Sequence, residues 1–499
     1  MFKKILIANR GEIAVRVMAT CREMGIATVA VYSDVDAEAL HRLCADEAVC
    51  IGRADPADSY LNGAKIIDAA RKSGAQAIHP GYGFLAENAD FAQLCEASGI
   101  VFIGPPSTVI RSLGDKTVAR QIMAGSGVPV IPGMNMPESD FKKMAAHAEA
   151  IGYPVLVKAA AGGGGKGMRI VTEPTQLSEA LVAASGEAAA AFGNGAIYLE
   201  KYIARPRHVE IQVLADRFGH TVHLGERECS IQRRHQKIIE ETPSTALTPD
   251  LREAMGRAAV QAAVAAGYVN AGTVEFLVDE KKNFYFLEVN TRLQVEHPIT
   301  ELVTGIDLVR RQIEIAAGER LDLVQKDIQA RGHAIECRIY AEDPENNFMP
   351  SPGRITLLEE PRGPGIRNDC GVYAGFTVPM EYDPVLSKLV VHAGTRQAAI
   401  DRMKKALSDY RIAGIRTPIS FLMEVVDSAP FRNGETFTDF LDTHFSEWKP
   451  AQADNTLAAL VFIAHTMWAG TPVASGPGTG TGGNGGIPSP WQTLGHWRL

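Results

Sequence analysis

Five polar residues, each two positions from the next, combine acids, amides and an arginine in the second half of the chain. They are Glu288, Asn290, Arg292, Gln294 and Glu296. The residues between them are mostly apolar, and this alternation predicts a half-buried strand. An edge strand with a charged outer face is the alternative, but such faces usually carry Lys, Thr and Glu. The mixture of side chains therefore favours a binding site over a solvated edge.

The length of this stretch limits how its polar residues can share one ligand. A fully extended chain from Glu288 to Glu296 would span roughly 26 Å at about 3.3 Å per residue. One small-molecule site cannot use both ends of such a span. We therefore expect the strand to end near Asn290 and the chain then to curl, so that Arg292, Gln294 and Glu296 return to the same ligand.

A second acid is expected beside this strand. Residues 273–278 alternate as a strand does and place Glu275 on it. Two acids on neighbouring strands, Glu275 and Glu288, with Asn290 nearby, offer the oxygen ligands that Mg²⁺ prefers together with nucleotide phosphates. The sequence thus predicts a site for one or two Mg²⁺ ions.

A glycine-rich segment could bind phosphate. Four consecutive glycines, Gly162–Gly165, stand between a predicted strand at 154–158 and another at 168–171. Backbone amides of glycines approach an anion without side-chain obstruction. No Ser or Thr follows Lys166 and a strand comes next, so this is no Walker loop. We expect a mobile hairpin that closes over a triphosphate, with Lys158 as a point charge; a flexible turn without a ligand is the alternative.

Two further segments carry polar groups at regular spacing. Residues 207–213 alternate strictly, with His208, Glu210 and Gln212 on one face of a predicted strand. Residues 226–237 are dense in charged and amide groups, and a run of this kind is by default a solvated surface.

The N-terminal part must supply the framework. Apolar runs at residues 5–8, 28–32, 49–51, 77–79 and 101–104 alternate with helical patterns. This alternation predicts a parallel, doubly wound sheet. The first strand is followed by one glycine, Gly11, and not by a GxGxxG fingerprint, so a dinucleotide site is weakly supported. Residues 79–88 leave a strand end where such sheets bind ligands, although a structural turn fits them equally well.

Composition narrows the class of protein. The chain has 499 residues, a net charge of −8 and seven cysteines. The length suits two to four domains, and the charge argues against non-specific nucleic-acid binding. No cysteine pair has CxxC spacing, so neither a zinc site nor a disulfide framework is indicated. The first apolar run is too short for a signal peptide, and no segment is long enough to span a bilayer. We expect a cytoplasmic protein with no membrane partner.

Together these segments resemble the ATP-grasp superfamily and, more narrowly, biotin carboxylase. The resemblance runs from residue 1 to about residue 447. The matching motifs are ANRGEIA from Ala8, HPGYGFLAEN from His79, GGGGKGM from Gly162, EKYI from Glu200, RHVEIQV from Arg207, RECSIQRRHQK from Arg227, FLEVNTRLQVEHPITE from Phe286 and GHAIECRIYAEDP from Gly332.

The resemblance implies an α/β fold with three domains. A parallel doubly wound N-terminal domain is expected at 1–113 and an ATP-grasp domain at 114–330, with its mobile glycine-rich lid at about 131–203. An α+β barrel-sandwich domain follows at 331–447. We expect a helix and flexible linker at 448–489, and the start of a truncated following domain at 490–499.

The resemblance also assigns roles to individual residues. The implied ATP-binding residues are Lys116, Lys158, Gly163, Gly164, Gly165, Lys166, Gly167, Met168, Glu200, Lys201, Ile203, His208, Gln232 and His235. The implied metal ligands are Glu275, Glu288 and Asn290, and bicarbonate is assigned to Lys237, Arg292, Gln294 and the Val295 amide. Glu296 is the implied general base, and Arg338 would stabilise the enolate form of biotin, which Tyr82 and Gly83 help to seat.

The implied reaction joins ATP, bicarbonate and biotin through carboxyphosphate, as the first half-reaction of a biotin-dependent carboxylase. ATP, Mg²⁺ (or Mn²⁺) and biotin on a carrier protein are the expected cofactors. The Met-Lys-Met motif that carries biotin is absent from the sequence, so the carrier must be supplied in trans. The other expected partners are a second copy of the chain, contacting residues near Arg16 and Glu23, and a carboxyltransferase subunit. An acyl-CoA is the expected final acceptor. The alternatives are another ATP-grasp ligase and a non-catalytic assembly subunit.

Overall fold

The computed structural model describes the chain except for residues 135–137, 139, 160–167, 235, 451–459 and 461–499. By their contacts the residues divide into two compact units, Met1–Trp448 and Lys449–Leu499. The first unit carries every predicted site residue. No described helix combines the length and apolar character that crossing a membrane requires.

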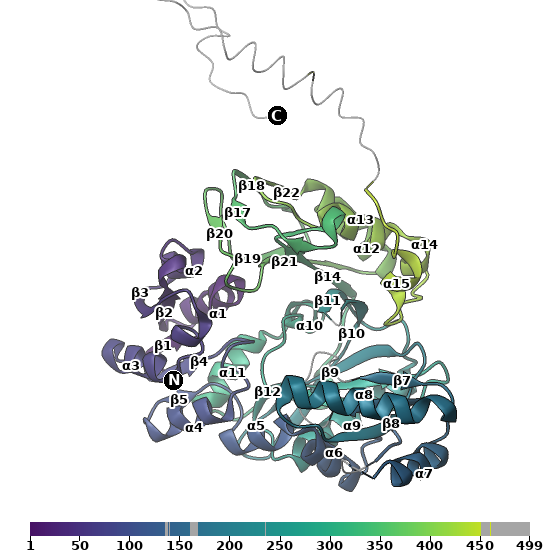
Figure 1. Cartoon of the computed structure of the whole chain (residues 1–499). Helices are drawn as coiled ribbons and strands as arrows, with labels where there is room; N and C mark the ends of the chain where they lie inside the picture. The colour runs from purple at the N-terminus through teal and green to yellow at the C-terminus, as the bar shows by residue number, and fades with distance from the viewer. Residues whose placement is uncertain (135–137, 139, 160–167, 235, 451–459, 461–499) are drawn as a thin grey trace, which may run out of the picture. The chain divides into compact units, whose positions relative to one another are not determined.

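The N-terminal sheet is parallel, as predicted. Its strands are β1 (Lys4–Ile7), β2 (Ala27–Ser33), β3 (Glu47–Gly52), β4 (Ala77–His79) and β5 (Val101–Phe102), in the order β3-β2-β1-β4-β5. The connecting helices are α1 (Gly11–Glu23), α2 (Leu40–Cys44), α3 (Gly63–Ser73), α4 (Ala89–Ala97) and α5 (Ser107–Gly114). Alternate residues of β1 face opposite sides, so that Ile5 and Ile7 join one apolar core and Leu6 joins another. Figure 1 shows this part in purple.

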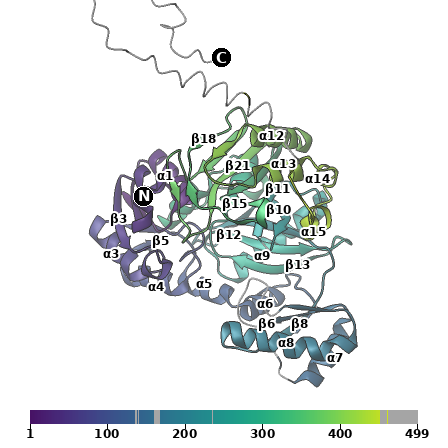
Figure 2. The same cartoon turned by 45° about the horizontal axis from the view of Figure 1, so that its top comes forward.

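A small antiparallel sheet forms a separate lobe with its own core. It consists of β6 (Val155–Ala159), β7 (Arg169–Val171) and β8 (Ile197–Lys201), in the order β7-β6-β8. The helices α7 (Phe141–Ile151) and α8 (Pro174–Phe192) pack against it, and α6 (Lys116–Gly125) precedes it in the chain. Figure 2 shows these elements at the lower end of the view. The predicted glycine hairpin joins β6 to β7, and its residues 160–167 lie outside the described part.

The largest sheet has eight antiparallel strands and contains most of the predicted site. In the order β13-β12-β9-β10-β11-β14-β21-β19, the strands span Phe284–Asn290, Asn270–Val278, Arg207–Ala215, Thr221–Arg233, Gln236–Thr242, His333–Tyr340, Val385–Ala393 and Ile366–Cys370. The pairing of β11 with β14 carries the sheet across the predicted domain boundary at 330/331. That boundary stays a prediction, whereas the sheet itself is continuous.

Helices and short strands complete the first unit. The helices are α9 (Pro249–Ala265), α10 (His297–Thr304), α11 (Leu308–Ala316), α12 (Arg396–Asp409), α13 (Ile419–Asp427), α14 (Ala429–Arg432) and α15 (Phe440–His444). The short strand pairs are β15 (Glu342–Asp343) with β16 (Met349–Pro350), β17 (Gly353–Arg354) with β20 (Thr377–Val378), and β18 (Leu357–Glu359) with β22 (Arg411–Ala413). The antiparallel character predicted for the C-terminal part is confirmed, as is the amphipathic helix predicted at 397–407, which lies within α12.

Candidate active site

The strand that carries Glu288 ends where the sequence predicted. β13 stops at Asn290, and α10 begins at His297. Between them the chain curls, and the Arg292 guanidinium donates from Nη2 to Asn290 Oδ1 and from Nη1 to Gln294 Oε1, both at 3.2 Å. The expectation that these side chains return to one place is therefore confirmed.

The predicted metal ligands come together at the end of β12 and β13. Glu275 and Glu288 are direct partners across this antiparallel pair, and Asn290 Nδ2 donates to Glu275 Oε1 at 2.8 Å. Glu288 Oε2 lies 4.0 Å from Lys116 Nζ. Burial and the neighbouring Glu275 carboxylate raise the pKa of Glu288. These hard oxygen atoms and their mutual repulsion fit a divalent cation such as Mg²⁺.

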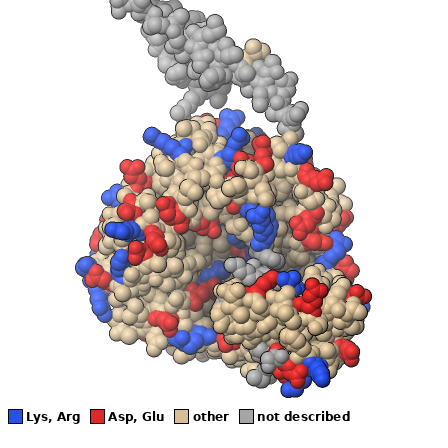
Figure 3. All heavy atoms as spheres, in the orientation of Figure 1, with Lys and Arg blue, Asp and Glu red and all other residues tan. Residues whose placement is uncertain are grey.

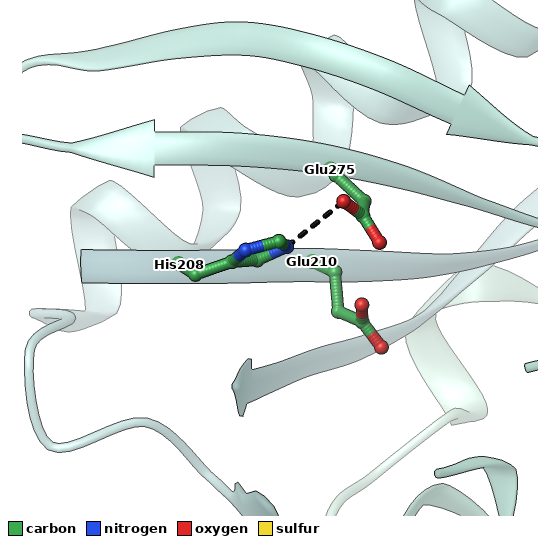
Figure 4. Close-up of side chains that lie close together, drawn as sticks. All are labelled: His208, Glu210 and Glu275. Atoms are coloured by element: carbon green, nitrogen blue, oxygen red, sulfur yellow. Dashed lines mark ion pairs between the residues drawn. The ribbon is translucent and has the colours of Figure 1, made fainter. Parts of the chain in front are cut away.

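A second group of possible ligands lies beside the first. His208 and Glu210 on β9 point toward Glu275 on β12, as Figure 4 shows, and His208 Nε2 lies 2.9 Å from Glu275 Oε2. Both oxygens of Glu210 already accept from cations, one from Lys237 and one from Arg227, each at 2.5 Å. Glu210 is therefore less suited to a metal ion than Glu275 and Glu288.

Lys237 on β11 is the centre of a charged group that we call the buried ion cluster, formed by Lys237, Arg338, Glu210 and Glu296. The Lys237 ammonium donates to Glu210 Oε2 at 2.5 Å, Glu275 Oε1 at 2.9 Å and Glu296 Oε1 at 2.6 Å. Burial alone would lower the pKa of Lys237, but these three carboxylates raise it well above its usual value. The ammonium therefore stays charged.

Glu296, the predicted base, is 0% exposed and lies between two cations. Its Oε1 accepts from Lys237, and its Oε2 accepts from Arg338 Nη2 at 3.0 Å. Burial would raise the pKa of Glu296, but Lys237 and Arg338 hold it well below its usual value. Glu296 is thus ionised, which is the form that a general base requires.

The charged segment at residues 226–237 is not solvated, so that default interpretation is wrong. Its residues form β10 and β11 inside the large sheet, and Arg227 is 0% exposed. The Arg227 guanidinium donates to Glu210 Oε1 at 2.5 Å, Gln212 Oε1 at 2.8 Å and Thr300 Oγ1 at 2.9 Å. Its partners come from β9 and α10, so the segment's own composition could not reveal them.

The small lobe faces a cavity of about 1020 Å³. The predicted ATP-binding residues Lys158, Met168, Glu200, Lys201, Ile203, His208 and Gln232 line it. Lys158 Nζ donates to Glu200 Oε2 at 2.9 Å, and Arg120, which the sequence did not single out, donates to Glu200 Oε1 at 2.8 Å. The predicted residues Gly163, Gly164, Gly165, Lys166, Gly167 and His235 lie outside the described part.

A second cavity of about 720 Å³ adjoins the buried ion cluster. The predicted residues Tyr82, Gly83, Lys237, Glu275, Glu288, Asn290, Arg292, Gln294, Val295 and Arg338 line it. His208 and Gln232 line both cavities. Gln294 Nε2 is buried without a hydrogen-bond partner among the described residues, so this wall holds an amide donor for an anion. Figure 3 shows a hollow at the centre of the molecule in which both acidic and basic side chains are visible.

Sequence reasoning missed several residues that support this cavity. Tyr82 Oη donates to Glu12 Oε1, and Lys388, which is fully buried, donates to the Val295 carbonyl at 3.0 Å and lies 3.2 Å from Glu12 Oε2. Glu87, from the segment predicted as a ligand-binding strand end, accepts from Arg292 Nε at 2.8 Å. Only Glu87 lay within a motif that the sequence had marked.

Three family models match successive parts of the chain. They are described as "Biotin carboxylase, N-terminal domain" over residues 1–110, "Carbamoyl-phosphate synthase L chain, ATP binding domain" over 115–324, and "Biotin carboxylase C-terminal domain" over 336–443. A subunit of pyruvate carboxylase from Methanothermobacter thermautotrophicus is 55% identical over 444 residues, covering 89% of this chain and 90% of the relative. Biotin carboxylase 1 of Bacillus subtilis is 53% identical over 445 residues, covering 89% and 99%.

Solved structures agree with these matches. The biotin carboxylase domain dimer of Hydrogenobacter thermophilus 2-oxoglutarate carboxylase, in complex with MgADP, ADP and bicarbonate, superposes with a TM-score of 0.86 at 50% identity, covering 91% of this chain and 100% of that chain. A biotin carboxylase from Campylobacter jejuni in complex with a β,γ-ATP compound gives 0.85 at 47% identity, covering 89% and 99%.

Proposed function

The chain belongs to the biotin carboxylase family and is an ATP-dependent ligase that carboxylates biotin, and from this premise we propose how its residues divide the work. The observation that carries the proposal is the buried ion cluster. There an ionised Glu296 lies behind a cavity wall, between Lys237 and Arg338, and both of these cations face the cavity.

ATP occupies the cavity beneath the small lobe. Its phosphates contact Lys116, Lys158 and His208, and the residues of 163–168 close over them. Glu200 and the backbone of Lys201 and Ile203 contact adenine, and Gln232 and His235 contact the sugar side. His208 and Gln232 line both cavities, which supports placing the γ-phosphate where the two meet.

Glu275 and Glu288, with Asn290 beside them, hold Mg²⁺ or Mn²⁺. When bound, the cation neutralises charge on the phosphoryl oxygens during transfer. The facing carboxylates of β12 and β13 and the raised pKa of Glu288, caused by burial and Glu275, support this assignment.

Bicarbonate binds to Arg292, Lys237, the Gln294 side chain and the Val295 amide. It displaces part of the contact between Lys237 and Glu296, and the freed Glu296 carboxylate removes its proton. The resulting oxyanion attacks the γ-phosphorus as the bond to ADP breaks, which yields carboxyphosphate. The unpartnered Gln294 Nε2 and the guanidinium of Arg292 support this placement of the anion.

Biotin enters beside Tyr82 and Gly83. Carboxyphosphate breaks into CO₂ and phosphate, and the phosphate takes the proton from the ureido nitrogen. Negative charge moves to the ureido oxygen, where the Arg338 guanidinium stabilises it as an oxyanion-hole cation does. The nitrogen then attacks CO₂ to give carboxybiotin.

The chain works with partners that it does not contain. A carrier protein presents biotin, a carboxyltransferase selects the final acceptor, and two copies of the chain form a homodimer. The dimer of the 2-oxoglutarate carboxylase domain supports the last point. An acyl-CoA acceptor remains our prediction. The named relatives include a pyruvate carboxylase component at 55% identity and the alpha subunit of methylcrotonoyl-CoA carboxylase from Glycine max at 52%, so identity does not separate the two acceptor classes.

The test is ADP release from ATP, Mg²⁺ and bicarbonate, with and without free biotin, in the wild type and Glu296→Gln. We expect biotin to stimulate turnover in the wild type and the variant to lose about 10²- to 10⁴-fold, as expected when a general base is removed. Turnover that ignores biotin would reject biotin as the acceptor. Turnover that survives the substitution would reject Glu296 as the base.

A further inference from the structure

The guanidinium of Arg338 on β14 is held by two buried carboxylates and not by one. Its Nε donates to Glu240 Oε1 at 2.6 Å, and its Nη2 donates to Glu296 Oε2 at 3.0 Å. Glu296 is the proposed base, and its partnership with Arg338 must change when it accepts a proton. Glu240 on β11 has no part in the proposed reaction and does not line the cavity. Its contact with Nε therefore needs an explanation of its own.

A third carboxyl group, Glu336, stands beside Glu240. The two residues are direct partners across β11 and β14, so their side chains leave the same face of the sheet with Cβ atoms about 4.5–5.5 Å apart. Glu336 is 0% and Glu240 is 1% exposed. Both oxygens of Glu336 and Oε2 of Glu240 are buried without a hydrogen-bond partner among the described residues.

This arrangement indicates that one proton resides on the pair. Two ionised carboxylates at adjacent buried positions repel each other, and unpaired buried oxygens are costly. A proton on Glu336 removes one charge. Burial and Glu240 raise the pKa of Glu336 well above its usual value. Burial raises the pKa of Glu240 to about 7, although Arg338 opposes this.

We propose that Glu240, backed by a neutral Glu336, is the positioning residue of Arg338: it anchors Nε while the Nη atoms pass from Glu296 to the ureido oxygen of biotin. This rests on the proposed function. When Glu296 takes the proton of bicarbonate, its hold on Arg338 weakens. A planar guanidinium with one fixed corner then turns toward the new oxyanion without losing its direction. Glu240 and Glu336 keep their shared proton throughout.

Two rates separate positioning from general damage. The first is bicarbonate-dependent ADP release without biotin, which uses Glu296 but does not need the ureido oxyanion. The second is the biotin-stimulated rate, resolved into kcat and KM for free biotin. For Glu240→Gln we expect the biotin-stimulated kcat to fall about 10- to 100-fold, less than on removal of an oxyanion donor itself, and the first rate to change less than about threefold.

Three further variants make the test sharp. Glu240→Asp keeps the charge but withdraws it from Nε, so we expect an intermediate loss of kcat in a protein that folds. Glu336→Gln mimics a neutral acid, so we expect both rates to stay within about threefold of the wild type. The matched control is Glu241→Gln. Glu241 points to the other face of β11 and bonds His333 and Arg396, so its loss should lower stability without changing the ratio of the two rates.

Three results would overturn the inference. Glu240→Gln could lower both rates equally, it could leave the biotin-stimulated rate unchanged, or Glu336→Gln could damage it as severely. An infrared spectrum tests the proton directly, because we expect a protonated carboxylic acid band at neutral pH that Glu336→Gln removes. If the wild type itself shows no biotin stimulation, the proposed function fails first, and that outcome is distinct from every result above.

Discussion

The two ends of the proposed active site differ in how the protein neutralises their charges. In the buried ion cluster, Lys237 reaches three carboxylates within 2.9 Å, and its side chain is 13% exposed. At the other end, the pair of Lys116 and Glu288 is 4.0 Å apart, and the two side chains are 41% and 42% exposed. The first end is preorganised by protein groups alone. The second leaves charge that a cation and phosphates can take up. The comparison suggests that the base is built into the fold, whereas the nucleotide end is completed by its ligands.

The largest expected effect comes from removing one cation at each end. Lys237→Met leaves Glu210, Glu275 and Glu296 facing one another without their ammonium. We expect a loss of about 3–5 kcal/mol in the free energy of unfolding, as for other broken buried ion pairs. Lys116→Met removes a half-exposed partner and should cost less than about 1 kcal/mol. Urea denaturation of both variants without ligands measures the contrast, and equal losses would contradict it.

A buried carboxyl that is neutralised by a proton should show itself in the pH dependence of stability. Burial raises the pKa of Glu12 from 4.5 to about 7, although Lys388 opposes this. Between these values the native state holds a proton that the unfolded chain has released. The free energy of unfolding should therefore fall as pH rises from about 4.5 to about 7, by up to about 3 kcal/mol, and then level off.

Glu12→Gln provides the comparison for this effect. The variant lacks the titrating group, so its stability relative to the wild type should change across the same pH window. Urea denaturation at several pH values between 5 and 8 measures the difference, in which the other titrating groups cancel. Parallel curves for the two proteins would show that Glu12 stays ionised beside Lys388.

Arg338 tests whether the cluster supplies direction as well as charge. In Arg338→Lys the charge remains, but an ammonium lacks the planar fork that bonds Glu240 and Glu296 together. We expect the biotin-stimulated kcat to fall about 100-fold, as when an oxyanion donor is lost. Bicarbonate-dependent ADP release without biotin is the internal control and should stay within about threefold. A full retention of the biotin-stimulated rate would mean that charge alone suffices.

The sequence predicted those parts of the fold that depend on local patterns. The strands of the N-terminal sheet, the end of β13 at Asn290 and the pairing of Glu275 with Glu288 follow from periodicity and from the reach of an extended chain. Residues 226–237 were interpreted wrongly because their counter-charges lie on β9 and α10. Lys388 and Glu12 meet across most of the chain, and neither belongs to a pattern that requires the other.

The motif resemblance carried the site further than periodicity did. Its residues Lys237, Arg292, Gln294 and Arg338 line one cavity. It could not reveal Glu240 and Glu336, because their importance comes from the register of β11 against β14. Strand register between distant segments depends on the packing of the whole sheet, which no single segment encodes.

The smallest expected effect concerns Glu288 and has the opposite sign. Glu288→Gln removes a carboxylate that stands beside Glu275, and burial and that neighbour raise its pKa. Without metal, the variant should be as stable as the wild type or more stable, by less than about 1 kcal/mol, because the side chain is partly exposed and Lys116 loses its partner. The same change should raise the Mg²⁺ concentration needed for turnover by about tenfold or more, since one hard ligand is lost.

Urea denaturation with a chelator and a Mg²⁺ titration of ADP release measure the two effects. Glu280→Gln, an exposed substitution on the same hairpin, is the control and should change stability by less than about 0.5 kcal/mol. A gain or no change in stability together with weaker Mg²⁺ dependence would show that Glu288 is kept for its ligand. If Glu288→Gln instead destabilised the protein as strongly as Lys237→Met, the pair with Lys116 would be structural, and the two ends of the site would not differ in the way that their geometry indicates.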